Sequence, residues 1–189
     1  IFGTKTSSFG DNDFFVLRTD LDGNLIDSAS YSFENNLDVD LSGDGNFNII
    51  RGNEIASQIQ PIPGGGFIAI GTTSITETLL DISDWQLMTI AFLDDELRLL
   101  NDNDSVLSLS AEIDNFQLDL VGNDVIILSD GSLLIAGARE FDRGGGITDF
   151  DNFFLKINAD GTSGFLNTQG VPGEGQDDIL VRAFEKDSE

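Results

Sequence analysis

The sequence predicts an all-β protein that is built from repeats of a four-stranded antiparallel unit. Three observations support this prediction. The chain has 21 glycines among 189 residues, and many of them stand beside Asp, Asn or another Gly, as in turns. The apolar runs are short and are bounded by glycine, which is typical of buried strands. Two different motifs also recur along the chain with a similar period, which indicates tandem repeats.

The first recurring motif is a run of four apolar residues between glycines. The runs Phe67–Ile70 and Leu133–Ala136 each follow a glycine-containing turn and end at Gly71 and Gly137. Gly3 ends a shorter copy, so the period of these glycines is 71 − 3 = 68 and then 137 − 71 = 66. The runs predict strands that are buried on both faces. The turns before them predict tight hairpins of type I′, which require positive φ.

The second motif is a strand that begins with Asp and an aromatic residue and ends in an Asp-Gly turn. It covers Asp13–Asn24 and recurs in Asp151–Thr162, at an offset of 151 − 13 = 138. A weaker copy, Asp84–Ile90, has an offset of 84 − 13 = 71 from the first, with Trp85 in the place of Phe14. Both motifs together predict a unit in the order strand, hairpin, strand, loop, strand, hairpin, strand.

The repeat divides one domain into three units, approximately 1–52, 53–122 and 123–189. Each unit carries insertions between its strands, which we expect at Tyr31–Arg51, Ser74–Ser83, Asn101–Val121 and Phe141–Phe150. Near the end of the chain, Asp177–Phe184 is similar to Asn53–Gln60, the strand that precedes the turn Gly64–Gly66.

Four antiparallel strands in a tandem unit describe a blade of a β-propeller. The order of turn, apolar strand, Gly, loop, Asp-aromatic strand and Asp-Gly turn resembles the tandem blades of a large bacterial β-propeller family. The resemblance covers Ile1–Leu25, Glu54–Leu97 and Asp124–Thr162. It implies a protein of the cell surface or outer membrane, secreted or lipid-anchored, as is common in Bacteroidota. Since propellers have four to eight blades, three units predict an excerpt from a longer ring, with any signal or anchoring segment upstream of Ile1. The alternative is that the two ends complete one blade between them.

Composition excludes several classes of function. The chain has 9 basic and 34 acidic residues, a formal charge of −25, and neither cysteine nor histidine. Disulfides, thiolate nucleophiles, imidazole bases and Cys or His metal sites are therefore excluded. The charge opposes binding to nucleic acid and to anionic membrane surfaces. No apolar run approaches the ~18 residues of a membrane span.

The densest group of oxygen ligands is Asp38–Asn48, in which Asp38, Asp40 and Asp44 are candidate calcium ligands. An EF-hand loop does not fit, because its twelfth position falls on Arg51 or Ile49 instead of glutamate. A calcium site of another kind or a solvated insertion are the remaining interpretations. The Asp-Gly pairs elsewhere are expected to be structural turns.

Candidate partner-binding residues are Asp142 and Arg143, which precede three glycines in an insertion on one rim of the scaffold. A flexible connector is the alternative. Two Asp-Ser triplets, Asp27–Ala29 and Asp104–Val106, match a pattern of O-glycosylation in Bacteroidota. Acidic pairs that could serve a glycosidase are frequent in so acidic a chain and carry little information; they are Asp94–Glu96, Asp102 with Asp104, and Asp177 with Asp178.

These observations predict a non-enzymatic binding or scaffolding module of a bacterial cell-surface or outer-membrane-associated protein. Its partner would be another protein, bound by loops at the blade rim, and it would require no cofactor. The alternative is a carbohydrate-binding or glycan-degrading propeller in polysaccharide uptake, although Trp85 is expected to pack in a blade. A third hypothesis is a segment of an adhesin that Ca²⁺ stabilises.

Overall fold

The computed structural model describes residues 1–8, 10–32, 38–39, 48–49, 52–77, 82–100, 106–109, 111–113, 116–142, 148–158, 163–169 and 183. These residues form strands and turns, with no helix among them, which confirms the all-β prediction. Within this part of the chain, accordingly, no helix is long and apolar enough to cross a membrane.

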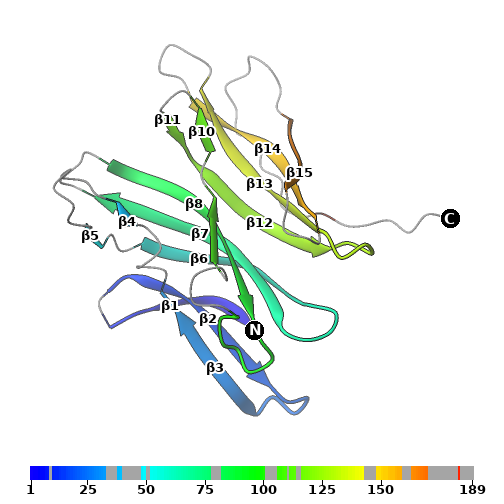
Figure 1. Cartoon of the computed structure of the whole chain (residues 1–189). Coiled ribbons are helices and arrows are strands. Elements are labelled where there is room, and N and C mark those ends of the chain that lie inside the picture. The colour runs from blue at the N-terminus through cyan, green and yellow to red at the C-terminus, as the bar shows by residue number, and fades with distance from the viewer. Residues whose placement is uncertain are drawn as a thin grey trace.

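Three antiparallel sheets make up most of the fold (Figure 1). The first sheet contains β1 (Phe2–Thr6), β2 (Asn12–Thr19) and β3 (Leu25–Tyr31). The second contains β6 (Gly52–Pro61), β7 (Phe67–Glu77), β8 (Ile82–Leu93) and β9 (Val106–Leu109). The third contains β12 (Leu120–Ile127), β13 (Leu133–Asp142), β14 (Thr148–Ile157) and β15 (Ser163–Gln169). Two small hairpins pair β4 (Asp38–Val39) with β5 (Asn48–Ile49) and β10 (Ala111–Ile113) with β11 (Phe116–Leu118).

The register of the strands shows that the three sheets are equivalent. The repeated glycines Gly3, Gly71 and Gly137 lie opposite Phe15, Thr89 and Phe153 on the next strand. The first strands of the second and third sheets also share a β-bulge, which falls between Ala56 and Gln58 in β6 and between Gly122 and Asp124 in β12. The glycine period and the order of four strands per unit are therefore confirmed for the second and third sheets. The first sheet has the last three of these four strands.

The predicted position of the middle copy of the second motif is wrong. The pairs that close the equivalent turns are Thr19–Leu25, Leu93–Leu99 and Ile157–Ser163. The offset of the middle pair from the first is 93 − 19 = 74, and not 71. Met88, at 14 + 74, thus takes the place of Phe14, and both side chains are fully buried. Trp85 lies elsewhere on β8, opposite Ile75.

The insertion expected at Ser74–Ser83 is largely strand. The pairing of β7 with β8 continues past the apolar run as far as Glu77 and Ile82. The reason is that the residues after Gly71 are mostly β-branched Thr and Ile, which favour strands although they are partly polar.

The sheets stack face to face, with the second sheet between the other two (Figure 1). Strand β6 packs against β1 and β2, and β12 packs against β6, β7 and β8. Adjacent residues of β7 enter different cores, because Ile68 faces the third sheet and Ala69 faces the first. The prediction that Phe67–Ile70 is buried on both faces is thereby confirmed. Within the described residues the sheets form an open stack and do not close a ring.

Candidate interaction surface

Four hairpin turns with the same pattern of hydrogen bonds mark one end of the sheets, which we call the turn end. They are Asp20–Asn24, Ile62–Gly66, Asp94–Arg98 and Leu128–Ser132. In each turn the first N–H donates to the fifth carbonyl and the fourth N–H donates to the first carbonyl. The fourth residue has positive φ in each case; these residues are Gly23, Gly65, Leu97 and Gly131.

The predicted turn type is wrong for the Asp130-Gly131 turn. In the Asp130-Gly131 turn only Gly131 has positive φ, whereas a type I′ turn requires it at both central residues. In this turn the hydrogen bonds and the single positive φ are those of a type I turn followed by a G1 bulge, the usual three-residue hairpin loop. The Ile62–Gly66 turn differs, because Gly64, Gly65 and Gly66 all have positive φ. The Asp-Gly pairs here are structural, as expected.

Aspartates at the start of two turns fix the backbone in the same way. Asp20 Oδ1 accepts hydrogen bonds from the N–H groups of Asp22 (3.0 Å) and Asn24 (2.8 Å). Asp94 Oδ1 accepts them from Glu96 (2.9 Å) and Arg98 (2.8 Å). The pKa of Asp20 is lowered chiefly by the Asn24 side chain, and the pKa of Asp94 chiefly by the Arg98 N–H. Both carboxylates therefore remain ionised and serve the turns.

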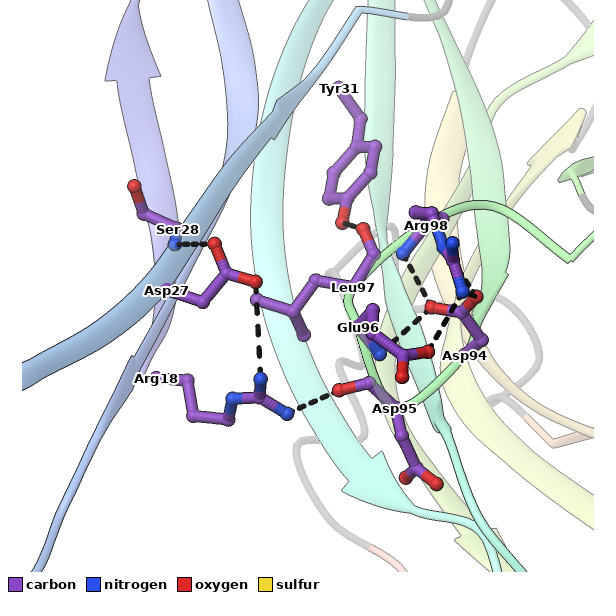
Figure 2. Close-up of polar contacts among 9 residues, drawn as sticks. All are labelled: Arg18, Asp27, Ser28, Tyr31, Asp94, Asp95, Glu96, Leu97 and Arg98. Carbon is purple, nitrogen blue, oxygen red and sulfur yellow. Dashed lines mark hydrogen bonds and ion pairs between the residues drawn. The ribbon is translucent and has the colours of Figure 1, made fainter.

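Side chains of the first sheet bind the Asp94–Arg98 turn of the second sheet (Figure 2). The Arg18 guanidinium donates to the carbonyl oxygen of Asp95 and lies 3.9 Å from a carboxylate oxygen of Asp27. The Tyr31 hydroxyl donates to the carbonyl oxygen of Leu97. Burial, with the nearby charges of Asp94 and Asp27, raises the pKa of Tyr31 to about 12. These contacts hold the first and second sheets together at the turn end.

A recess of about 240 Å³ opens between these two sheets near the same turns. Apolar side chains line much of it, among them Ile1, Val16, Ile59, Pro61, Phe67 and Leu97. Leu21 is fully exposed at the tip of its turn, and Leu25 and Ile26 are exposed at the start of β3. The turn end of the first sheet thus presents apolar surface to solvent, which is typical of an interaction site.

Acidic groups predominate around this apolar surface. The acidic residues of the two nearest turns and of β3 are Asp20, Asp22, Asp27, Asp94, Asp95 and Glu96, whereas the basic ones are Arg18 and Arg98. Asp95 Oδ1 accepts a hydrogen bond from Gly66 N (2.8 Å). Backbone N–H groups fix the carboxylates of Asp20, Asp94 and Asp95 in place, so the surface is preorganised to attract basic groups.

Of the predicted site residues, the structure describes only Asp38 and Asp142. Asp38 is in β4, and Asp40 and Asp44 fall outside the described residues. Asp142 ends β13, and Arg143 again falls outside. The calcium and partner-binding predictions at these positions therefore stay predictions. Among the described residues, no three or more acidic, Cys or His side chains gather as a metal-binding group.

The candidate acidic pairs and Asp-Ser triplets are also only partly within the described residues. Asp94–Glu96 lies in a turn, whereas Asp102, Asp104, Asp177 and Asp178 are outside the described residues. Ser28 of the first Asp-Ser triplet is exposed on the outer strand β3. The sequence offered no reason to single out Leu21, an apolar residue that lies between two aspartates and has a fully exposed side chain.

No protein-family model and no curated protein matches this chain.

Proposed function

We propose that the chain is a propeller-type array of blades that acts as a non-enzymatic binding module, with the turn end of its first sheet as the binding surface. The partner is a protein that offers basic and apolar side chains. The module belongs to a bacterial cell-surface or outer-membrane-associated protein and requires no cofactor.

The stacking of the sheets supports the propeller part of this proposal. Antiparallel units that repeat in tandem and pack face to face through their first strands are the arrangement of propeller blades. The repeated β-bulges of β6 and β12 fit the same interpretation, because equivalent blades need equivalent strand geometry. The cell-surface part rests on the resemblance of the repeat motifs.

One observation carries the binding part. Exposed Leu21, Leu25 and Ile26 stand beside turn carboxylates that backbone N–H groups hold in place. Three exposed apolar side chains within one turn and the start of the next strand are unfavourable in water, and a partner that covers them would remove this cost. The absence of Cys and His from the sequence supports binding over catalysis.

Affinity capture from surface and membrane fractions of the source organism tests the proposal. Wild-type chain should retain a stoichiometric protein, and a Leu21→Ser/Leu25→Ser variant should lose it. Ile55→Ser is the matched control, because Ile55 is also exposed but lies on β6 away from these turns. Equal capture by all three chains would contradict the proposed surface. Binding to a glycan array, with no protein retained, would favour the carbohydrate-binding alternative.

A further inference from the structure

The outer strand of the first sheet, β3, pairs along one of its edges. Its single partner strand within the described residues is β2. The Leu17 N–H of β2 donates to the Ile1 carbonyl oxygen (2.8 Å), so the backbone groups of Leu17 point away from β3. Since this direction alternates along a strand, the two neighbours of Leu17 bond to β3, where they face Ala29 and Asp27. The backbone groups of Ser28, between these two residues, therefore point to the other edge of β3, which we call the open edge.

The carboxylate of Asp27 lies at this open edge. Asp27 Oδ1 accepts a hydrogen bond from the Ser28 N–H (2.7 Å), and Asp27 Oδ2 lies 3.9 Å from the Arg18 guanidinium (Figure 2). The N–H group that an added strand would use is thus satisfied by a side chain. Charged side chains at sheet edges are a common means of preventing unwanted strand pairing. A strand that adds to β3 has to take the Ser28 N–H from Asp27.

This arrangement distinguishes the first sheet from the third. The repeat places Lys156 where Arg18 lies, at 18 + 138 = 156, and the residues opposite them are Phe165 and Asp27. Lys156 Nζ lies 3.0 Å from Asp130 Oδ2 at the turn end, and β15 contains no acidic residue. The repeated fold by itself therefore does not require a carboxylate at the edge of the outer strand.

The open edge is continuous with the proposed binding surface. Strand β3 follows the turn that carries exposed Leu21, and Leu25 and Ile26 at its start are also exposed. The Asp27 side chain is 42% exposed, so that a cation from outside can reach its carboxylate. The next residues, Ser28–Ser30, have small side chains, which leave the backbone of the edge accessible.

Charge decides between two occupants of this edge, a basic segment of another protein and a second copy of this chain. Each copy has a formal charge of −25 and would bring its own Asp27 to the edge. Like charges oppose such a pair, whereas a basic side chain beside Asp27 is attracted.

Resting on the proposed function, we propose that the protein partner binds through an extended segment that adds to the open edge of β3. A Lys or Arg of this segment takes the carboxylate of Asp27, and the released Ser28 N–H donates to a carbonyl oxygen of the segment. Main-chain hydrogen bonds supply affinity, and the basic residue beside Asp27, with apolar residues beside Leu25 and Ile26, supplies specificity.

Calorimetric titration of the full chain with a synthetic peptide of alternating Val and Lys tests this proposal. When a Lys lies opposite Asp27, the neighbouring Val lies opposite Ser28 and points its N–H to β3. Methylation of the Val nitrogens should therefore weaken binding about tenfold or more, because the charge is kept and the main-chain donors are lost. Methylation of the Lys nitrogens, which point away from β3, should leave binding unchanged.

Variants of the chain test the same edge from the other side. Ser28→Pro removes the outward N–H, at a place where proline is tolerated, and should weaken binding of the unmodified peptide about tenfold or more. Thr168→Pro is the matched control, because Thr168 of β15 occupies the place of Ser30 in β3. Asp27→Asn keeps an acceptor for Ser28 and loses the charge, so binding should weaken and depend less on salt. Circular dichroism shows whether each variant is folded.

Equal binding of the unmodified and the Val-methylated peptides, or no binding of either, would overturn the proposal. Self-association of the wild-type chain that Ser28→Pro abolishes would assign the edge to a second copy and would also overturn it. The proposed function is tested separately by capture with the Leu21→Ser/Leu25→Ser variant. If that variant loses the partner and folded Ser28→Pro retains it, the binding surface stands and strand addition is refuted.

Discussion

The ring of Phe14 in the first sheet fills the space in which a side chain on Gly71 of the second sheet would lie. A Cβ atom at Gly71 would overlap this ring and the carbonyl oxygen of Ile55. Gly3 occupies the equivalent position in the first sheet and has no atom within 4 Å of its Cβ position. The same repeated glycine therefore has a steric role in one sheet that it lacks in the other.

Gly71→Ala should consequently destabilise the fold, and Gly3→Ala should not. We expect a loss of about 1–3 kcal/mol in the free energy of unfolding for Gly71→Ala, because the ring of Phe14 on the first sheet and the carbonyl group of Ile55 have to move. Gly3→Ala should stay within about 0.5 kcal/mol of the wild type. Urea unfolding measures both, and equal effects would show that the sheets do not stack as described.

Leu97 offers a test of two opposed effects. Its φ of 61° is strained for a leucine, and this strain costs about 1–2 kcal/mol. Its side chain, however, is buried in the core between the first and second sheets, and its removal costs about 2–5 kcal/mol. Leu97→Gly should therefore lower the free energy of unfolding by about 1–3 kcal/mol. A variant more stable than the wild type would mean that the side chain packs poorly.

Tyr31 is the sole tyrosine, so its ionisation can be followed by ultraviolet absorbance. Its pKa is raised from an ordinary value of 10.0 to about 12 in the folded chain. The unfolded chain therefore loses this proton first, and stability should fall as the pH rises from 10 to 12. Titration near 10 without loss of structure would contradict the buried contact with Leu97.

Asp130 should make the fold sensitive to acid. The Ser132 N–H, with help from Lys156, lowers the pKa of this carboxyl from 3.8 to about 2. Its stabilising effect is complete above 3.8 and should be lost as the pH falls toward 2. Asp130→Asn should remove this part of the pH dependence in urea unfolding. Asp22→Asn, at an exposed position in another turn, is the control; an identical response of both variants would argue against the Ser132 and Lys156 contacts.

The glycine period was predictable because Gly3, Gly71 and Gly137 stand at the end of apolar runs that any buried strand needs. The position of the middle turn, Asp94–Arg98, was not predictable from the sequence. The residue with positive φ in this turn is Leu97, whereas the other turns have glycine at that position. Burial of the leucine side chain offsets its backbone strain, and an Asp-Gly search cannot detect such a turn. The contacts of Arg18 and Tyr31 with the Asp94–Arg98 turn depend on how two sheets stack, which no local pattern of residues specifies.

Site-specific photo-crosslinking tests the central claim, binding at the turn end, most directly. A crosslinking side chain is placed at Leu21, at the exposed tip of its turn, or at Ser8, which is exposed in the connection at the opposite end of the first sheet. In surface fractions of the source organism, we predict one discrete crosslinked protein from position 21 and none from position 8. The same product from both positions, or crosslinking from position 8 alone, would contradict the claim.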